Sequence, residues 1–147
     1  MKQIKVIKAN KAHKEFILHA NNEINNTNNI KQTNCLEQNI DKDYFCANPK
    51  FQCLVAEIDN KPVGMVLYSN FYWANDGEVL WISQMFVEEE YRKYGVFFKL
   101  IDKLRKENKN IKILSFATGA QNKRMQTILK YYSAHEINLK FYYKKVE

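Results

Sequence analysis

Four segments of the chain are rich in apolar residues in patterns typical of strands and are predicted to form strands. The first is Lys2–Ala9, in which polar and apolar residues alternate over most of the length. The next two, Gln52–Glu57 and Val63–Trp73, flank the turn-forming segment Asp59–Pro62, which predicts an antiparallel hairpin. A second turn signal, the run Asn-Asp-Gly, leads into a further strand over Glu78–Val87.

Helical spacing of apolar residues follows the first strand. Asn10 is a suitable N-cap for a helix. The apolar side of this helix would carry Ala12, Phe16, Ile17 and Ala20. The next segment, Asn21–Asn29, holds six asparagines in nine residues and is interpreted as a mobile loop. A weak apolar pattern at Leu36 and Ile40 predicts a short second helix.

The remainder of the chain alternates between helical and extended patterns. A helix that begins near Tyr94 has its apolar residues at helical spacing, namely Val96, Leu100, Ile101 and Leu104. A strand over Ile111–Ala117, a helix over Asn122–Tyr132 and one final strand or pair over Glu136–Val146 complete the pattern. The element order β-α-α-β-β-β-α-β-α-β predicts a single α/β domain over residues 1–147, built on a mixed sheet with one strand–helix–strand crossover.

Composition narrows the class of protein. With 147 residues, of which 46% are hydrophobic, the chain is long enough to form a full core. No apolar run reaches about 18 residues and the start carries no signal-peptide segment, so we expect no membrane span and a cytoplasmic location. Cys35, Cys46 and Cys53 form no CxxC pair and are interpreted as reduced thiols that pack in the core, and no metal site is expected.

The charge is unevenly distributed along the chain. The formal net charge is +7, and residues 103–147 hold eleven basic and three acidic side chains, a net charge of +8. This excess indicates either a phosphate-bearing ligand or a solvated lysine face. Nucleic acid is a less favoured partner, because the chain has only three arginines, Arg92, Arg105 and Arg124.

The stretch Met85–Leu100 carries the most informative chemistry. A predicted strand ends at Val87, an acidic loop follows, and Arg92 and Gly95 lie three residues apart where a helix opens. The free backbone N–H groups and the dipole of a helix N-terminus form a site for a pyrophosphate. Gly95 would let the backbone approach such a ligand closely, because glycine has no Cβ.

This stretch resembles the acyl-CoA-binding motif Arg/Gln-x-x-Gly-x-Gly/Ala of the GNAT superfamily of N-acetyltransferases. Val87 stands five residues before Arg92 and Leu100 eight residues after it, as in that family. Phe97 departs from the motif by replacing its last Gly or Ala, so its side chain must point away from the pyrophosphate. The resemblance implies a mostly antiparallel central sheet flanked by helices.

The resemblance also implies an enzyme that transfers an acetyl group from acetyl-CoA directly to a primary amine of a small molecule or peptide. Met85 would donate its backbone N–H to the oxyanion, and Phe86 and Val87 would bind the pantetheine arm. The pyrophosphate would be bound by Arg92, Lys93, Tyr94, Gly95, Val96, Phe97 and Phe98. Asn122 corresponds to the asparagine that opens the family's next helix and is expected to contribute to CoA binding.

The general base is left open by the sequence. The family's usual base positions are occupied here by Ser83 and Trp81, neither of which is a competent base. Glu78 lies at the wrong spacing unless a bulge intervenes. A water held by Ser83 or Gln84 is the remaining route for the amine proton.

The general acid is displaced from its usual place in the family. Leu129 occupies the position of the expected tyrosine, and Tyr131 and Tyr132 follow. One further helical turn would bring Tyr132 to the same face, so Tyr132 is the candidate acid. Packing is the competing role for both tyrosines.

Three classes of function are weighed. The first is an N-acetyltransferase, for which a homodimer is left open. The second is an acyl-CoA-binding module without turnover, which acetyl-CoA consumption over an amine panel would exclude. The third is an RNA- or ribosome-directed factor that uses the basic C-terminal third, and it predicts a steep salt dependence of nucleic-acid affinity.

Overall fold

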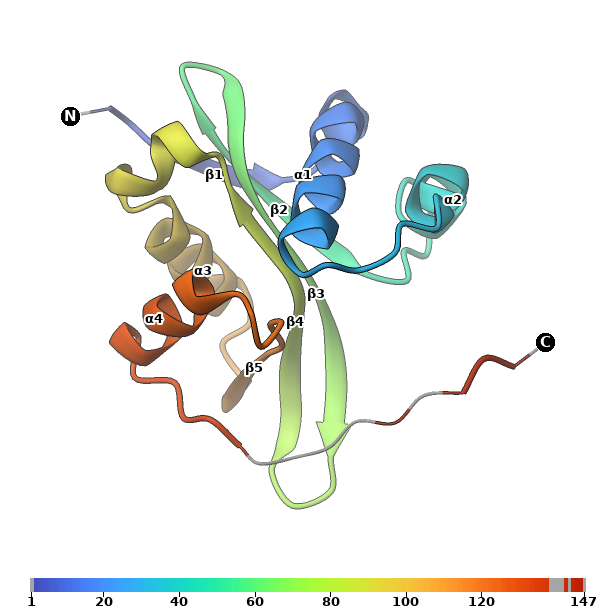
Figure 1. Cartoon of the computed structure of the whole chain (residues 1–147), viewed down its shortest axis with the longest axis vertical. Coiled ribbons are helices and arrows are strands. Elements are labelled where there is room, and N and C mark those ends of the chain that lie inside the picture. Colours follow the sequence, from blue (N-terminus) through green and yellow to red (C-terminus); the bar gives the residue numbers. More distant parts are fainter. Residues whose placement is uncertain (1, 138–141, 143, 147) are drawn as a thin grey trace. The chain divides into compact units, whose positions relative to one another are not determined.

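A computed structural model describes residues 2–137, 142 and 144–146 of the chain (Figure 1). The described residues form two compact units, Met1–Ala117 and Thr118–Glu147, which are described separately. That the whole chain forms one domain stays a prediction.

The first unit is built on a five-stranded sheet in the order β1-β2-β3-β4-β5. Its strands are β1 (Lys5–Lys8), β2 (Gln52–Ile58), β3 (Lys61–Trp73), β4 (Gly77–Val87) and β5 (Ile113–Phe116). Neighbouring strands are antiparallel except β4 and β5, which are parallel. The expected mixed, mostly antiparallel sheet flanked by helices is therefore confirmed.

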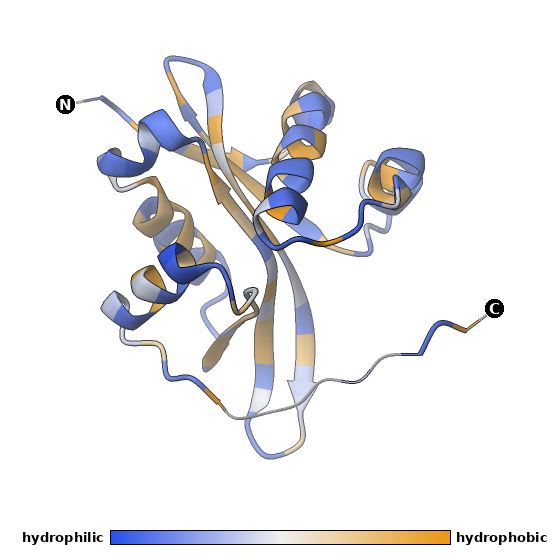
Figure 2. Cartoon of the chain, viewed as in Figure 1, coloured by the Kyte–Doolittle hydropathy of each residue, from blue (hydrophilic) through white to orange (hydrophobic). Residues whose placement is uncertain are grey.

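Helices cover both faces of this sheet, α1 and α2 on one side and α3 on the other (Figure 1). The helices of this unit are the 3-10 turn η1 (Lys11–His13), α1 (Lys14–Thr27), α2 (Cys35–Asp43), the 3-10 turn η2 (Glu89–Tyr94) and α3 (Val96–Glu107). Apolar residues concentrate along the central strands, whereas the turn between β3 and β4 is mostly hydrophilic (Figure 2). The strands therefore carry the core between two helical layers.

Each face of the sheet has its own set of buried side chains. The α1 face buries Ile17 and Ala20 of the helix together with Cys53, Val55, Met65, Leu67 and Phe86 of the strands. On the opposite face α3 lies directly over Gly64, where an added Cβ would come within 2.8 Å of Val96 Cγ1. Gly64 is thus needed for the close approach of α3 to β3.

The turn between β2 and β3 is shorter than the sequence indicated. Asp59 and Asn60 both adopt left-handed backbone conformations, with φ of 53° and 61°. Two such residues form the tight hairpin turn that matches the twist of the flanking strands. Lys61 and Pro62, expected in the turn, therefore already belong to β3.

The interpretation of Asn21–Asn29 as a mobile loop is wrong, because α1 continues to Thr27. Ile24 packs against the buried cluster, and Asn21 accepts a hydrogen bond from β4. Packing of one helix face against the sheet thus outweighs the poor helix propensity of asparagine.

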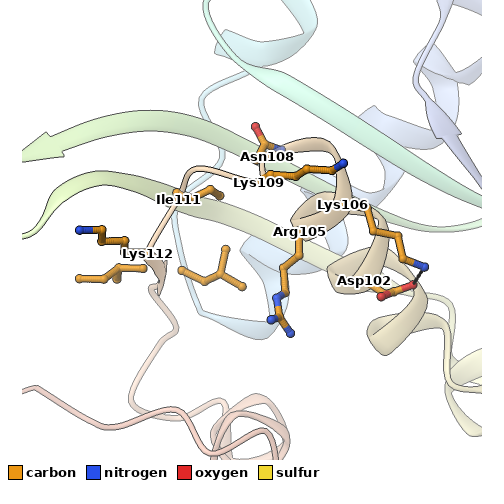
Figure 3. Close-up of a pocket in the computed structure, with 9 residues that line it drawn as sticks. Asp102, Arg105, Lys106, Asn108, Lys109, Ile111 and Lys112 are labelled. Atoms are coloured by element: carbon orange, nitrogen blue, oxygen red, sulfur yellow. Dashed lines mark hydrogen bonds and ion pairs between the residues drawn. The ribbon is translucent and has the colours of Figure 1, made fainter.

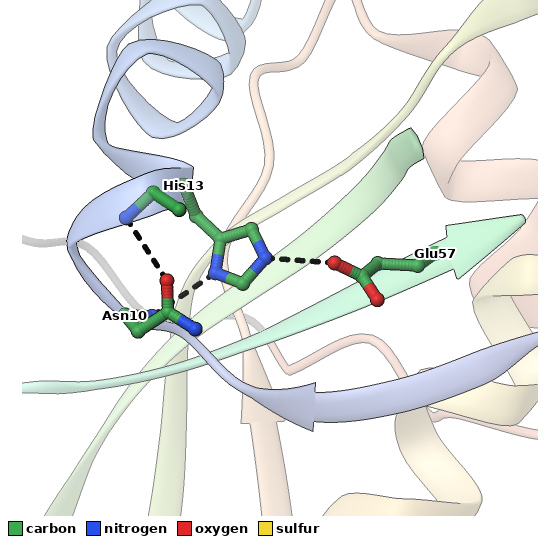
Figure 4. A network of polar contacts seen from close by, with 4 residues as sticks. Asn10, His13 and Glu57 are labelled. Atoms are coloured by element: carbon green, nitrogen blue, oxygen red, sulfur yellow. Dashed lines mark hydrogen bonds and ion pairs between the residues drawn. The ribbon is translucent and has the colours of Figure 1, made fainter. Parts of the chain in front are cut away.

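The start of α1 is held by a buried histidine (Figure 4). Asn10 accepts a hydrogen bond from the Ala12 N–H, as expected for a cap, and the Asn10 N–H donates to His13 Nδ1 at 3.0 Å. His13 Nε2 lies 2.9 Å from Glu57 Oε1 of β2, and His13 is only 4% exposed. Because Nδ1 accepts, the proton resides on Nε2, which donates to the carboxylate and ties the helix start to the sheet.

The second unit contains helix α4 (Lys123–Tyr131). Asn122 caps it by accepting a hydrogen bond from the Met125 N–H at 3.2 Å, so its expected place at the helix start is confirmed. The final strand or pair expected over Glu136–Val146 lies partly outside the described residues, and those described there, 136, 137, 142 and 144–146, are not in a strand.

Candidate active site

The central strand β4 loses its neighbour on one side partway along its length. It pairs with β5 only over Val79–Ile82, and β5 ends at Phe116. β4 continues for five more residues, Ser83–Val87, still paired with β3. In the described part of the chain, this edge of β4 is therefore not covered by a strand.

A β-bulge marks the point where β4 leaves β5. Leu67 of β3 lies opposite Gln84, and the next residue, Tyr68, lies opposite Ile82, so Ser83 is the extra residue. The Ser83 hydroxyl is exposed and donates to the Leu67 carbonyl oxygen at 3.3 Å. Bulges increase the local twist and redirect the strand. From the sequence, a bulge in this strand was considered only as a way to bring Glu78 to the base position, and its location was not predicted.

The hydrogen-bond pattern shows which backbone groups of β4 face the open edge. The Glu88 N–H donates to the Val63 carbonyl at 2.9 Å, which makes these two residues a hydrogen-bonded pair across the strands. Such pairs alternate along an antiparallel ladder, so Phe86 also directs its backbone groups toward β3. Met85 and Val87 lie between these positions and direct theirs to the opposite, open edge.

A side chain supports this orientation. Arg92 Nε donates to the Val87 carbonyl oxygen at 2.9 Å, so this carbonyl does not face β3. The geometry favours Met85 and Val87 over Phe86 as sources of backbone bonds to a ligand. The Phe86 ring instead packs edge-on against His19 of α1, with 5.7 Å between ring centroids.

The predicted pyrophosphate turn joins β4 to α3. Residues Glu89–Tyr94 form η2, Gly95 follows with φ of 75°, and α3 begins at Val96. Gly95 occupies the N-cap position of α3 but has no side chain with which to cap it. Nothing lies within 4 Å of a Cβ built on Gly95, so the space before the helix is open. This arrangement presents first-turn N–H groups to an anion.

The side chains around this turn fit the expected ligand. Phe97 is 7% exposed, so its ring points into the protein as the departure from the motif required. Lys93 Nζ lies 5.4 Å from the centroid of the Tyr94 ring, and Lys2 Nζ lies 5.7 Å from the same centroid. These two cations add positive charge beside the turn.

The base candidates of the sequence do not converge. Glu78 pairs with Tyr72 next to the turn of the β3–β4 hairpin, and Trp81 packs against Phe71 with 6.0 Å between centroids. The Ser83 hydroxyl uses its proton for the Leu67 carbonyl, which leaves its lone pairs for another donor.

The acid candidates lie in the second unit. Tyr132 follows α4 as its C-cap residue, and its N–H donates to the Ile128 carbonyl at 2.9 Å. Tyr131 is the last residue of α4 and is 80% exposed. The roles of Tyr132 and Asn122 at the site stay predictions.

The cysteines divide into two kinds. Cys53 is buried, and burial raises the pKa of its thiol to about 12, which makes it an unreactive core residue. Cys35 and Cys46 are exposed, so the expectation that all three thiols pack in the core is wrong for these two.

A hollow of about 480 Å³ lies away from the motif, at the C-terminal end of α3 (Figure 3). Its polar lining includes Arg105, Lys106, Lys109 and Lys112, together with Asp102 and Asn108. Lys106 Nζ is 2.7 Å from Asp102 Oδ2. The hollow is basic, but it lies at the opposite end of the helix from Gly95.

Residues 18–132 match the acetyltransferase (GNAT) family, and the chain belongs to this family of acetyltransferases. It is similar to the thialysine N-epsilon-acetyltransferase of Mus musculus, with 29% identity over 116 residues that cover 72% of this chain and 68% of the mouse protein.

Two solved structures share the fold. One is a possible acetyltransferase from Clostridium difficile 630, with a TM-score of 0.78, 20% identity and 98% of each chain covered. The other is the aminoglycoside N-acetyltransferase AAC(6')-Iy in complex with CoA, with a TM-score of 0.77, 16% identity, and 99% of this chain and 96% of that chain covered.

Neither a membrane-spanning helix nor a metal-binding cluster occurs among the described residues. These residues contain no helix that is both long and apolar enough to cross a membrane. They also contain no group of three or more His, Cys, Asp or Glu residues arranged to hold a metal ion.

Proposed function

We propose that this acetyltransferase transfers the acetyl group of acetyl-CoA to a primary amine of a small molecule or peptide. The observation that carries the proposal is the open edge of β4, along which Met85 and Val87 direct their backbone groups. That edge continues through η2 into the uncapped N-terminus of α3. One continuous stretch thus offers donors for a thioester, an amide-bearing arm and a pyrophosphate.

The proposed reaction is a direct transfer. The neutral amine attacks the thioester carbonyl carbon, a C–N bond forms, and the Met85 N–H donates to the oxyanion of the tetrahedral intermediate. The intermediate collapses as the C–S bond breaks, the amine nitrogen loses one proton, and the CoA thiolate gains one. The names of the relatives support this chemistry, because the mouse protein acetylates an N-epsilon amine and AAC(6')-Iy was solved with CoA.

The pyrophosphate is proposed to bind at the turn before α3. Its donors would be the backbone N–H groups of Gly95, Val96, Phe97 and Phe98, with Arg92, Lys93 and Tyr94 beside them. The N-terminal end of the helix dipole favours the negative charge there. Asn122 is retained as a further proposed contact of CoA, and Phe86 is retained only for contacts that do not use its backbone, because its backbone groups are directed toward β3.

The proton transfers are assigned to Ser83 and Tyr132. A water that donates to the Ser83 hydroxyl would take the amine proton, because Ser83 itself has no basic group. Tyr132 would protonate the thiolate. Tyr132→Phe should then lower kcat by about 10²–10⁴-fold, whereas Tyr131→Phe should behave as wild type. A wild-type kcat in the Tyr132→Phe variant would exclude Tyr132 as the general acid.

The test of the function is a calorimetric titration with acetyl-CoA, followed by turnover assays with thialysine, lysine and neamine. Binding with CoA release that depends on the amine is expected. Absence of binding at millimolar acetyl-CoA would overturn the proposal, and binding without turnover would favour the acyl-CoA-binding module.

The proposal extends to cellular location and oligomeric state. We propose a cytoplasmic location, which cell fractionation tests. A homodimer is left open by the sequence, and sedimentation at micromolar concentration decides it.

A further inference from the structure

Gln84 of β4 holds a polar atom that the mechanism above does not use. It lies between the bulged residue Ser83 and the proposed oxyanion donor Met85. Gln84 Nε2 donates to Asn21 Oδ1 of α1 at 2.6 Å. The other end of the amide, Oε1, is buried and has no hydrogen-bond partner among the described residues.

The position of Gln84 places this atom on the α1 face of the sheet. Its cross-strand partner Leu67 belongs to the buried cluster under α1, as does Phe86 two residues further along β4. In the other direction the same face continues with Phe71 and Trp81, and Phe71 is 50% exposed. Gln84 therefore lies at the boundary between the part of β4 that α1 covers and a more open aromatic surface.

A buried carbonyl oxygen without a donor is costly to a folded protein. Asn21 fixes the amide by accepting from its nitrogen, so the side chain cannot turn to satisfy Oε1 without giving up that bond. A ligand that brings an N–H group to Oε1 would remove this cost. The folded protein thus holds a rigid hydrogen-bond acceptor one residue from Met85, and a ligand reaches this covered atom once the side chains over it move aside.

We propose that Gln84 Oε1 accepts a hydrogen bond from the attacking amine and holds its nitrogen for attack on the thioester, with Asn21 as the residue that positions the amide. This proposal rests on the proposed function. A primary amine can donate one N–H to Oε1 and keep its lone pair directed at the carbonyl carbon. Gln84 orients the nucleophile but takes no proton, since a carboxamide oxygen is not a base at neutral pH.

A neutral acceptor has a consequence for pH dependence. A carboxamide attracts an ammonium ion more weakly than a carboxylate does and cannot take its proton, so only amine that is already neutral can attack the thioester. The wild-type kcat/KM should therefore rise with pH until the pKa of the free amine. Gln84→Glu would introduce a carboxylate that binds the ammonium form and accepts its proton, which should raise kcat/KM at low pH relative to its high-pH value.

The variant Gln84→Met keeps the length of the side chain and removes both polar atoms. With thialysine as acceptor, we expect kcat/KM to fall by about tenfold or more, while the Kd of acetyl-CoA changes by less than about twofold. Asn21→Ala should produce a smaller fall of the same kind, and Asn21→Asp should restore activity because it keeps an oxygen for Gln84 Nε2. Asn22→Ala, an exposed neighbour, is the matched control and should match wild type.

The outcomes separate the two proposals. Wild-type turnover with unchanged kcat/KM in Gln84→Met and Asn21→Ala would overturn the role of Gln84 and leave the proposed function intact. Absence of acetyl-CoA binding or of amine-dependent turnover in the wild type would overturn both. If Gln84→Met does not fold, as thermal denaturation would reveal, the pH profile of Gln84→Glu decides, and a profile identical to wild type would overturn the role of Gln84.

Discussion

The two ends of α3 attract negative charge in different ways, the N-terminal end through its backbone and the C-terminal end through its side chains. At the N-terminal end, Gly95 leaves the first-turn N–H groups uncapped beside an open space. At the C-terminal end, the cations Arg105, Lys106, Lys109 and Lys112 surround a hollow. The segment Glu89–Tyr94 before α3 has two acidic and two basic residues, so the excess of positive charge along the sequence points to the C-terminal end of α3.

The cations at the C-terminal end have local roles that account for them. Lys106 pairs with Asp102 at 2.7 Å, and Lys103 pairs with Glu107 at 2.9 Å. Basic residues also complement the negative end of the helix dipole. A count of charged side chains therefore favours the C-terminal end of α3 as the phosphate site, although the helix dipole there repels an anion. Backbone geometry favours the N-terminal end at Gly95. The variants below have different expected effects for these two sites.

The largest effect is expected from Gly95→Glu. It places a carboxylate in the open space before α3 and a Cβ on a residue with φ of 75°. Acetyl-CoA affinity should fall by about 100-fold or more, because the new carboxylate repels the pyrophosphate and offsets the attraction of the helix dipole. Calorimetric titration measures the loss.

The matched control for this change is Gly77→Glu. Gly77 has φ of 83° and an equally open Cβ position, but it lies at the β3–β4 turn. It should show the same backbone strain and near-normal affinity. A folded Gly95→Glu variant with wild-type affinity would place the phosphates elsewhere.

A smaller effect is expected from Arg92→Met. Arg92 joins the turn to β4 through the Val87 carbonyl, so its removal should loosen both the pyrophosphate and pantetheine contacts. We expect acetyl-CoA affinity to fall about tenfold. Arg105→Met, the same change at the other end of α3, should leave the affinity unchanged. Equal losses in the two variants would contradict the assignment.

A third effect should be close to zero. Replacing Lys106, Lys109 and Lys112 together with Gln removes most of the positive charge of the hollow. Acetyl-CoA affinity at physiological salt should change by less than about twofold, because salt screens exposed charges that lie the length of α3 away from Gly95. A tenfold loss would place the phosphates in the hollow. A steep salt dependence of RNA binding that the triple variant abolishes would favour the RNA-directed function instead.

The smallest effect concerns pH. The hydrogen bond from Lys106 holds the pKa of Asp102 below its usual value of 3.8. A carboxyl whose pKa is lower in the folded state stabilises the fold at pH values above its unfolded pKa, and this contribution is lost as the pH falls through the folded pKa. Asp102→Asn should therefore lower the Tm barely measurably at pH 7 and not at all near pH 2. A larger difference at pH 2 than at pH 7 would contradict this.

Features with a local signal were predictable from the sequence. The β2–β3 hairpin follows from two apolar-rich segments around the Asp59-Asn60 turn, and both its strands were found. The turn between Arg92 and Gly95 follows from its position between a strand and an apolar helix pattern. Asn122 was expected at a helix start from the helix predicted over Asn122–Tyr132 and from the resemblance to the family, and the structure shows that its cap is a local contact with the Met125 N–H.

Features that depend on distant partners were not predictable. Asn21–Asn29 has the composition of a loop, and most of it is helical because Ile24 contacts the buried cluster and Asn21 bonds to β4. The bulge at Ser83 has no signature of its own, because it depends on how β4 pairs with β3. The separation of β4 from β5 depends in turn on where β5 ends.

The sequence by itself therefore determined most of the elements, their order as far as α4 and the motif that assigns the chain to its family, because alternation, helical spacing and capping are properties of neighbouring residues. Only the tertiary structure decided which groups meet at the site. Gln84 and Asn21 are 63 residues apart and are joined by one hydrogen bond between β4 and α1. The physical reason is that such a contact depends on the register of the strands and on the packing of a helix against them, which no short segment of the chain encodes.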